Sequence, residues 1–158
     1  MFAFRIRNLE HMAALGRALA DCLRAEPSLR CILLRGGLGS GKTTLTRFLV
    51  EALPGGVAAE ISSPSFTLCN VYPTTPPVFH CDLYRVGGAV PDELSETLDT
   101  GEMAVLVEWA EYLPCSYLPQ DFLDIYFQVC DDYRIVCVEV HSPHSARIKI
   151  LLQAVQST

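Results

Sequence analysis

The residues at positions 36–43 have the types and spacing of a phosphate-binding loop. They read Gly-Gly-Leu-Gly-Ser-Gly-Lys-Thr, which fits the pattern G-x-x-x-x-G-K-[ST]. Glycines let the backbone turn so that successive N–H groups point at phosphate oxygens, and the start of a following helix adds its positive end. In this pattern Lys42 reaches the β- and γ-phosphates and the Thr43 hydroxyl ligates Mg²⁺. The loop therefore predicts binding of a nucleoside triphosphate, with Lys42 exposed at its end and without a structural partner other than phosphate.

A site of this kind needs a second protein group that holds Mg²⁺, an acidic side chain at the end of a buried strand. Two carboxylates fit that description, because Glu108 follows the apolar run 103–107 and Asp82 follows the extended run 78–81. Each has a structural alternative. Glu108 could cap the next helix, and Asp82 could pair with Arg85.

The nucleotide itself is predicted to be ATP. A guanine-reading [NT]-K-x-D tetrapeptide is absent from the sequence, in which lysine occurs only at positions 42 and 149. A hydroxyl-rich stretch could sense the γ-phosphate as a switch loop, although such residues are common in loops; it contains Ser62, Ser63, Ser65 and Thr67.

The seven cysteines form an odd set without a C-x-x-C pair, which favours reduced, structural thiols in a reducing compartment. Two short clusters, His80-Cys81-Asp82 and His141-x-x-His144, could be read as metal-ligand pairs. Neither has the four-ligand spacing of a zinc site. Mg²⁺ is therefore the metal that the sequence predicts.

Short apolar runs and amphipathic stretches alternate along the chain and must position these residues. Strands are expected at 2–6, 31–34, 65–72, 78–84, 103–108, 122–130 and 133–140, with 65–72 and 78–84 forming a hairpin. Helices are expected at 9–25 behind an Asn8 N-cap, at 42–53, from Pro91 at the first helical position, and after a Ser142-Pro143 cap. This mixture predicts an α/β fold, a P-loop NTPase-like domain with a mixed central sheet and flanking helices, spanning residues 1–158.

The composition of the chain fits one compact domain that is expected to be cytoplasmic. Its 158 residues are 50% apolar, enough for a core, while the longest apolar runs are too short to span a membrane. The first residues lack a signal peptide's apolar region. These features predict a protein without a membrane partner.

Charge is distributed unevenly around a net value of −6. Between Arg85 and Arg134 there is no Lys or Arg but there are eleven carboxylates, at Asp92, Glu93, Glu96, Asp99, Glu102, Glu108, Glu111, Asp121, Asp124, Asp131 and Asp132. Direct binding of a polyanion across a broad basic face is therefore not expected. The acidic stretch is either a solvated face or a docking surface for a basic partner.

Four blocks of this sequence, in this order, resemble the TsaE (YjeE) family, the small ATPases of bacterial tRNA threonylcarbamoyladenosine biosynthesis. They are the loop followed by Thr-Thr-Leu-Thr-Arg (43–47), Ser-Pro-Ser-Phe-Thr-Leu (63–68), His-Cys-Asp-Leu-Tyr-Arg (80–85) and Val-Leu-Val-Glu-Trp (105–109). The resemblance implies a protein that helps to install a threonylcarbamoyl group on the adenosine next to the anticodon. It also implies the transferase subunit and that subunit's inactive paralogue as partners, with tRNA reached only through the complex.

The same resemblance implies roles for individual residues. Thr43 and Glu108 would hold Mg²⁺, Asp82 would be the second acid of the catalytic site, and Ser65 would belong to a switch-like loop. Trp109 falls on the family's tryptophan, with a core aromatic as the alternative. Phosphates and nucleotide would be held by Lys42 together with groups of Leu38, Gly39, Ser40, Gly41, Thr43 and Thr44, and by Arg134 nearby.

Three positions depart from the family's pattern. Gly37 stands where an acid is usual, Met12 where a hydroxyl residue is usual and Cys81 where an aromatic is usual. A small-molecule kinase is an alternative function, although the stretch 86–133 lacks the arginines of a phosphoryl-transfer lid. A nucleotide-dependent switch without hydrolysis is another, and Gly37 makes it more credible.

Overall fold

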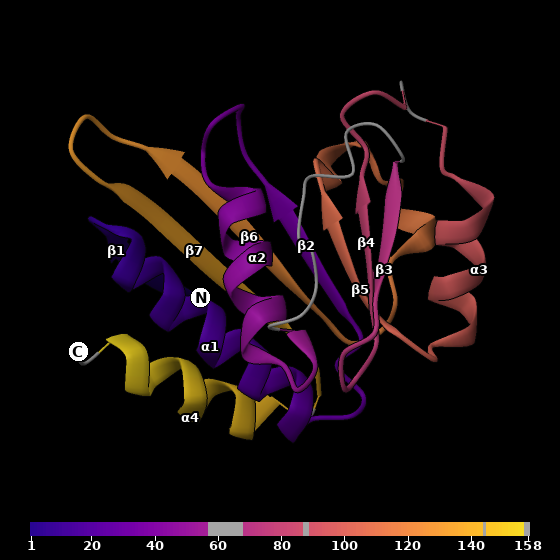
Figure 1. Ribbon diagram of the computed structural model, residues 1–158, viewed down its shortest axis with the longest axis horizontal. Coiled ribbons are helices and arrows are strands. Elements are labelled where there is room, and N and C mark those ends of the chain that lie inside the picture. The colour runs from indigo at the N-terminus through magenta and orange to yellow at the C-terminus, as the bar shows by residue number, and fades with distance from the viewer. Residues whose placement is uncertain (57–67, 87–88, 144, 157–158) are drawn as a thin grey trace.

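The computed structural model describes residues 1–56, 68–86, 89–143 and 145–156, and these residues form one seven-stranded sheet with helices on both faces (Figure 1). The strands are β1 (Phe2–Ile6), β2 (Cys31–Arg35), β3 (Cys69–Tyr72), β4 (Val78–Asp82), β5 (Ala104–Glu108), β6 (Phe122–Val129) and β7 (Arg134–His141). The α-helices are α1 (Leu9–Ala25), α2 (Lys42–Ala52), α3 (Asp92–Thr100) and α4 (Ser145–Gln156), and two short 3₁₀ turns are η2 (Ala110–Tyr112) and η3 (Cys115–Tyr117).

The sheet is mixed, with the strand order β1-β7-β6-β2-β5-β4-β3. Its centre is parallel, because β2 lies between β5 and β6 and pairs in parallel with both, and β4 continues in parallel beside β5. The outer pairs β1–β7, β6–β7 and β3–β4 are antiparallel. The carboxyl ends of β2, β4 and β5 therefore meet at one edge, where α/β proteins place their ligands.

Alternate residues of the central strands point to opposite faces and build two apolar clusters. On one face, Ile32, Leu34 and Leu106 pack with apolar side chains of α1, α2 and α4. On the other face, Leu33 and Val105 pack with Leu94 of α3 and with residues around η2. In Figure 1, α1, α2 and α4 accordingly lie together, and α3 lies on the other side of the molecule, beyond β3 to β5. A sheet covered on both faces explains the continuously apolar central strands.

Helix α1 begins and packs as its sequence indicates. The Asn8 side chain accepts a hydrogen bond of 2.9 Å from the His11 N–H, as an N-cap does. Gly16 lets α1 approach α2 closely, because a Cβ at that position would lie 2.7 Å from Cβ of Phe48. This contact packs α2, with the loop that precedes it, closely against α1.

The expected fold class and mixed sheet are confirmed, with local corrections. Pro91 is the N-cap of α3 and not its first helical residue. Helix α4 begins at Ser145, behind β7, which reaches His141. The hairpin of β3 and β4 is present, but β3 begins at Cys69 and residues 65–67 of the expected strand lie outside the described residues. In the described part of the chain, no helix is long and apolar enough to cross a membrane.

Candidate phosphate-binding site

The predicted loop connects the end of β2 to the start of α2 at the edge where the parallel strands end. Gly41 is the N-cap of α2 with φ of 109°, and Gly36 has φ of 143°, both conformations that favour glycine. A Cβ at Gly36 would also lie 2.9 Å from the Phe127 carbonyl oxygen. The Leu45 N–H donates to the Gly41 oxygen over 2.9 Å, so the N–H groups before it have no acceptor within the helix. They form the anion-binding end of α2.

The expectation that Lys42 is exposed and without a structural partner is wrong. The residue is 5% exposed, and its Nζ donates to the carbonyl oxygens of Gly36, at 2.6 Å, and Gly37, at 2.9 Å. Nζ also lies 4.1 Å from the centroid of the Trp109 ring, a cation–π contact. Burial lowers the pKa of Lys42, opposed by the nearby carboxylates. The loop thus folds over the ammonium group, which its own carbonyls hold.

Thr43 and Glu108 meet as the sequence predicts. The Thr43 hydroxyl donates to Glu108 Oε2 over 2.8 Å, and Glu108 is only 2% exposed. The alternative that Glu108 caps the next helix is not found, because the N-cap of η2 is Trp109, without a side-chain capping bond. The two residues place a hydroxyl and a carboxylate side by side, and such hard oxygen groups are the ligands that Mg²⁺ prefers.

The contact of His80 with Glu108 is a feature of the site that the sequence did not predict. His80 Nε2 lies 2.9 Å from Glu108 Oε1, and its Nδ1 lies 3.4 Å from the Tyr72 hydroxyl. His80 is fully buried, so the contact holds Glu108 from the side opposite Thr43. The available signal was a histidine within the buried strand pattern of residues 78–82. A zinc site would need several His, Cys, Asp or Glu side chains close together. Among the described residues, no group of three or more such side chains could hold a metal ion.

Asp82 lies at the same sheet edge, directly beside Glu108 in the register of β4 and β5. Its Oδ1 accepts a hydrogen bond of 2.9 Å from the Tyr84 N–H, and the residue is mostly buried. Parallel pairing thus brings together two carboxylates that are far apart in the sequence.

A cavity of about 350 Å³ joins these groups. Its lining residues are Leu38, Gly39, Ser40, Gly41, Lys42, Thr43 and Thr44 from the loop and α2, together with Leu68, Asp82, Tyr84, Arg85, Glu108 and Trp109. Ser40 Oγ is buried and, among the described residues, has no hydrogen-bond partner. An unpaired hydroxyl in a glycine-rich loop is consistent with a polar ligand. Ser65 lies outside the described residues.

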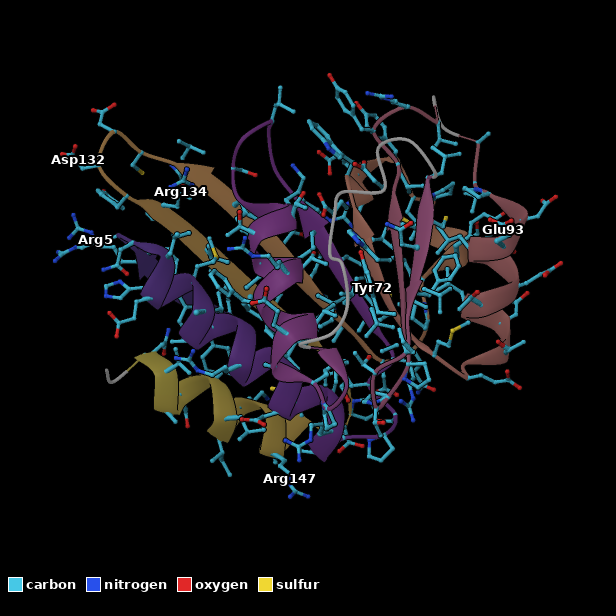
Figure 2. All side chains as sticks on the ribbon, viewed as in Figure 1. Arg5, Tyr72, Glu93, Asp132, Arg134 and Arg147 are labelled. Carbon is cyan, nitrogen blue, oxygen red and sulfur yellow. The ribbon has the colours of Figure 1, made fainter. Side chains whose placement is uncertain are left out.

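Arg134 lies against the loop and is not among the residues that line the cavity. Its Nη2 donates to the Gly39 oxygen over 3.5 Å, and its Nε is buried without a partner in the described ranges. Figure 2 shows Arg134 on the β6–β7 hairpin, on the side of the molecule where the loop before α2 lies. Met12 is buried beneath the loop, with its Cε 3.1 Å from the position of a Cβ at Gly41.

Trp109 is a partly buried aromatic residue that directly follows β5. Its ring packs on the apolar cluster of α3 and η2, and it also lines the cavity. The Tyr84 ring lies 4.6 Å away and the Tyr112 ring 6.2 Å away, between centroids. With φ of 57°, the Trp109 backbone adopts a left-handed conformation directly after Glu108. The indole is therefore presented to Lys42 at the end of β5.

Comparison with known proteins agrees with this geometry. A family model described as "Threonylcarbamoyl adenosine biosynthesis protein TsaE" matches residues 6–136. The chain is 40% identical to the TsaE protein of Streptomyces coelicolor over 63% of this chain and 68% of that protein. It is 43% identical to the one of Aquifex aeolicus over 72% of this chain and 80% of that protein. The crystal structure of Bacillus subtilis YdiB superposes with a TM-score of 0.70 and 25% identity, covering 99% of this chain and 94% of that one.

Proposed function

The chain belongs to the TsaE family, and we propose that it is an Mg²⁺-dependent ATPase of tRNA threonylcarbamoyladenosine biosynthesis. In this role it would assist the threonylcarbamoyl transferase complex, which modifies the adenosine next to the anticodon. The observation that carries the proposal is the hydrogen bond of 2.8 Å between Thr43 and Glu108, where the glycine-rich loop leads into α2. It joins the two groups that a P-loop enzyme uses to hold its metal.

Three kinds of donor in the loop region would bind the triphosphate. Lys42 would exchange the carbonyl oxygens of Gly36 and Gly37 for phosphate oxygens, since an ammonium gains more from an anion than from a neutral carbonyl. The N–H groups of residues 38–44 and the unpaired Ser40 hydroxyl would donate to the same phosphates. Because these donors are fixed before the ligand arrives, little ordering cost opposes binding.

Thr43 and Glu108 would hold Mg²⁺, which when bound neutralises charge on the β- and γ-phosphate oxygens. His80 would fix the Glu108 carboxylate through its 2.9 Å contact. Asp82, in register with Glu108, would position the attacking water. Arg134 would stabilise phosphate charge if it left Gly39, and Ser65 remains a predicted switch residue outside the described part of the chain.

The isolated protein is expected to hydrolyse ATP slowly, because its cavity holds few charge-stabilising groups. P-loop NTPases with an incomplete set turn over at roughly 10⁻⁴ to 10⁻² s⁻¹, and a supplied group adds about 10³–10⁵-fold. The proposed partners are the transferase subunit and its inactive paralogue, with tRNA reached through the complex.

An acidic surface on α3 supports partner docking. Its four carboxylates are exposed, whereas Glu108 and Asp124 of the acidic stretch are buried and are not available to a partner. Figure 2 shows Glu93 on the outer side of this helix. The exposed residues are Asp92, Glu93, Glu96 and Asp99. A basic patch on a partner would complement them.

Phosphate release tests the proposal. It would be measured with ATP and Mg²⁺ on the purified protein alone and after addition of the two transferase subunits. Slow release alone and a rise of at least 10-fold in the mixture are expected. Fast release alone, about 1–100 s⁻¹ without any response to the subunits, would instead fit a kinase-like enzyme.

A further inference from the structure

Two cysteines face each other across the β3–β4 hairpin, next to the cavity. Cys69 and Cys81 are partners in the antiparallel register, and their Sγ atoms lie 2.9 Å apart. Both are free thiols. Their chain neighbours, Leu68 and Asp82, line the cavity.

The backbone geometry of this pair suits a disulfide. The Asp82 N–H donates to the Leu68 oxygen over 2.9 Å, which makes Leu68 and Asp82 a hydrogen-bonded pair. Because such pairs alternate along an antiparallel ladder, Cys69 and Cys81 form a non-hydrogen-bonded pair, in which Cα atoms lie about 4.5 Å apart. This spacing falls within the range that disulfides span. Closing the bond therefore needs side-chain rotation and no separation of the strands.

The two thiols differ in access. Cys69 is partly exposed on the edge strand, whereas Cys81 is fully buried. The hydrogen bond between the sulfurs lowers the pKa of Cys69 and raises that of Cys81, with burial adding to the rise. An external oxidant therefore meets Cys69 first, and Cys81 can react only with a sulfur brought to it by Cys69.

We propose that Cys69 and Cys81 form an oxidisable dithiol, a covalent modification site whose oxidant is a small disulfide such as oxidised glutathione. The Cys69 sulfur attacks one sulfur of oxidised glutathione, forms a mixed disulfide, and releases one glutathione that takes the proton of Cys69. The Cys81 sulfur then attacks Cys69 Sγ and expels the second glutathione, which takes the proton of Cys81. Two thiols are oxidised and one glutathione disulfide is reduced to two thiols, so atoms and electrons balance.

The bond would tie edge strand β3 covalently to β4 at the end that carries Asp82. Strand β3 lies at the edge of the sheet and pairs only with β4 among the described strands. The disulfide closes a short loop, and such a link stabilises the folded state by restricting the unfolded chain. The inference concerns this hairpin and does not depend on the proposed ATPase activity.

The test is to incubate the full chain with oxidised and reduced glutathione at graded ratios, block free thiols, and map the cysteines by peptide mass spectrometry. The expected product is a Cys69–Cys81 disulfide, with exposed Cys115 carrying glutathione as an internal control for oxidant access. In Cys81→Ser, Cys69 should stop at the mixed disulfide. In Cys69→Ser, Cys81 should stay reduced.

Two results would overturn the proposal. One is accumulation of Cys69 as a free thiol or as the glutathione adduct in the unsubstituted chain while Cys115 is modified. The other is a fall in the thermal unfolding midpoint on disulfide formation, which would show that the link distorts the native hairpin. The expected result is a rise of about 5 °C on oxidation of the unsubstituted chain and an unchanged midpoint in Cys81→Ser.

Discussion

Thr43 donates a hydrogen bond of 2.8 Å to Glu108, across a sequence separation of 65 residues. The contact joins the first turn of α2 to the end of β5 and exists because β5 pairs in parallel with β2, the strand that leads into the glycine loop. Glu108 is held on its other oxygen by buried His80. The carboxylate is thus oriented before any metal or nucleotide arrives.

Glu108→Gln should lower Mg²⁺-dependent phosphate release by about 100-fold or more while changing ATP affinity without metal by less than about 3-fold. The amide keeps the shape of the side chain but loses the charge that holds the metal. Phosphate release and calorimetric titration measure the two effects, with exposed Glu96→Gln on α3 as the matched control. Unchanged hydrolysis in Glu108→Gln would reduce this residue to a structural role.

His80→Phe should lower phosphate release by about 10- to 100-fold and raise the Mg²⁺ concentration required for half-maximal rate, because Glu108 loses the group that orients it. A buried oxygen left without its partner should also cost about 1–3 kcal/mol of unfolding free energy. His80→Gln can present a nitrogen near the same position and should recover most of the activity. Equal Mg²⁺ dependence in all three proteins would mean that His80 only packs.

Trp109 should report on the loop, since it is the chain's one tryptophan and its ring contacts Lys42 at 4.1 Å. Binding of ATP would draw the ammonium toward phosphate, so the indole fluorescence should change in a saturable way. The same titration with Lys42→Ala should give a changed starting signal and no saturable response in the same concentration range. A fluorescence change of equal size and midpoint in both proteins would show that the Trp109 signal does not depend on movement of the Lys42 ammonium.

Reversing charge on α3 should weaken association with the transferase subunits. Glu93→Lys combined with Glu96→Lys places two cations on the exposed acidic face, and the effect should shrink as salt rises. Phosphate release by the isolated protein should stay within about 2-fold, because α3 carries none of the residues that line the cavity. Glu10→Lys on α1 is the control, since it changes charge outside the acidic stretch. If both variants bind the transferase subunits equally well, the acidic face of α3 is a solvated surface and not a docking surface.

Much of this site could be predicted because its parts are local. The run from β2 through the loop into α2 carries its own turn residues, and Asp82 and Glu108 end apolar strands whose parallel pairing places them at one edge. The position of Lys42 could not be predicted, since it depends on how the loop carbonyls of Gly36 and Gly37 turn inward.

Other features depend on sheet register, which short sequence patterns do not encode. The contact of His80 with Glu108 requires β4 to pair beside β5, and the Cys69–Cys81 pair requires the hairpin to close at one particular residue. The described structure leaves the role of Ser65 as a prediction, because that residue lies outside its ranges.

The most direct test of the central claim is a calorimetric titration of ATP with Mg²⁺ into the unsubstituted chain, Lys42→Ala and Lys149→Ala. Lys149 is the other lysine of the chain and is exposed on α4, away from the loop, so its variant controls for loss of charge. The account predicts one site in the unsubstituted chain and in Lys149→Ala, and binding weakened by about 100-fold or more in Lys42→Ala, with each protein folded by circular dichroism. Near-native affinity in folded Lys42→Ala would contradict it.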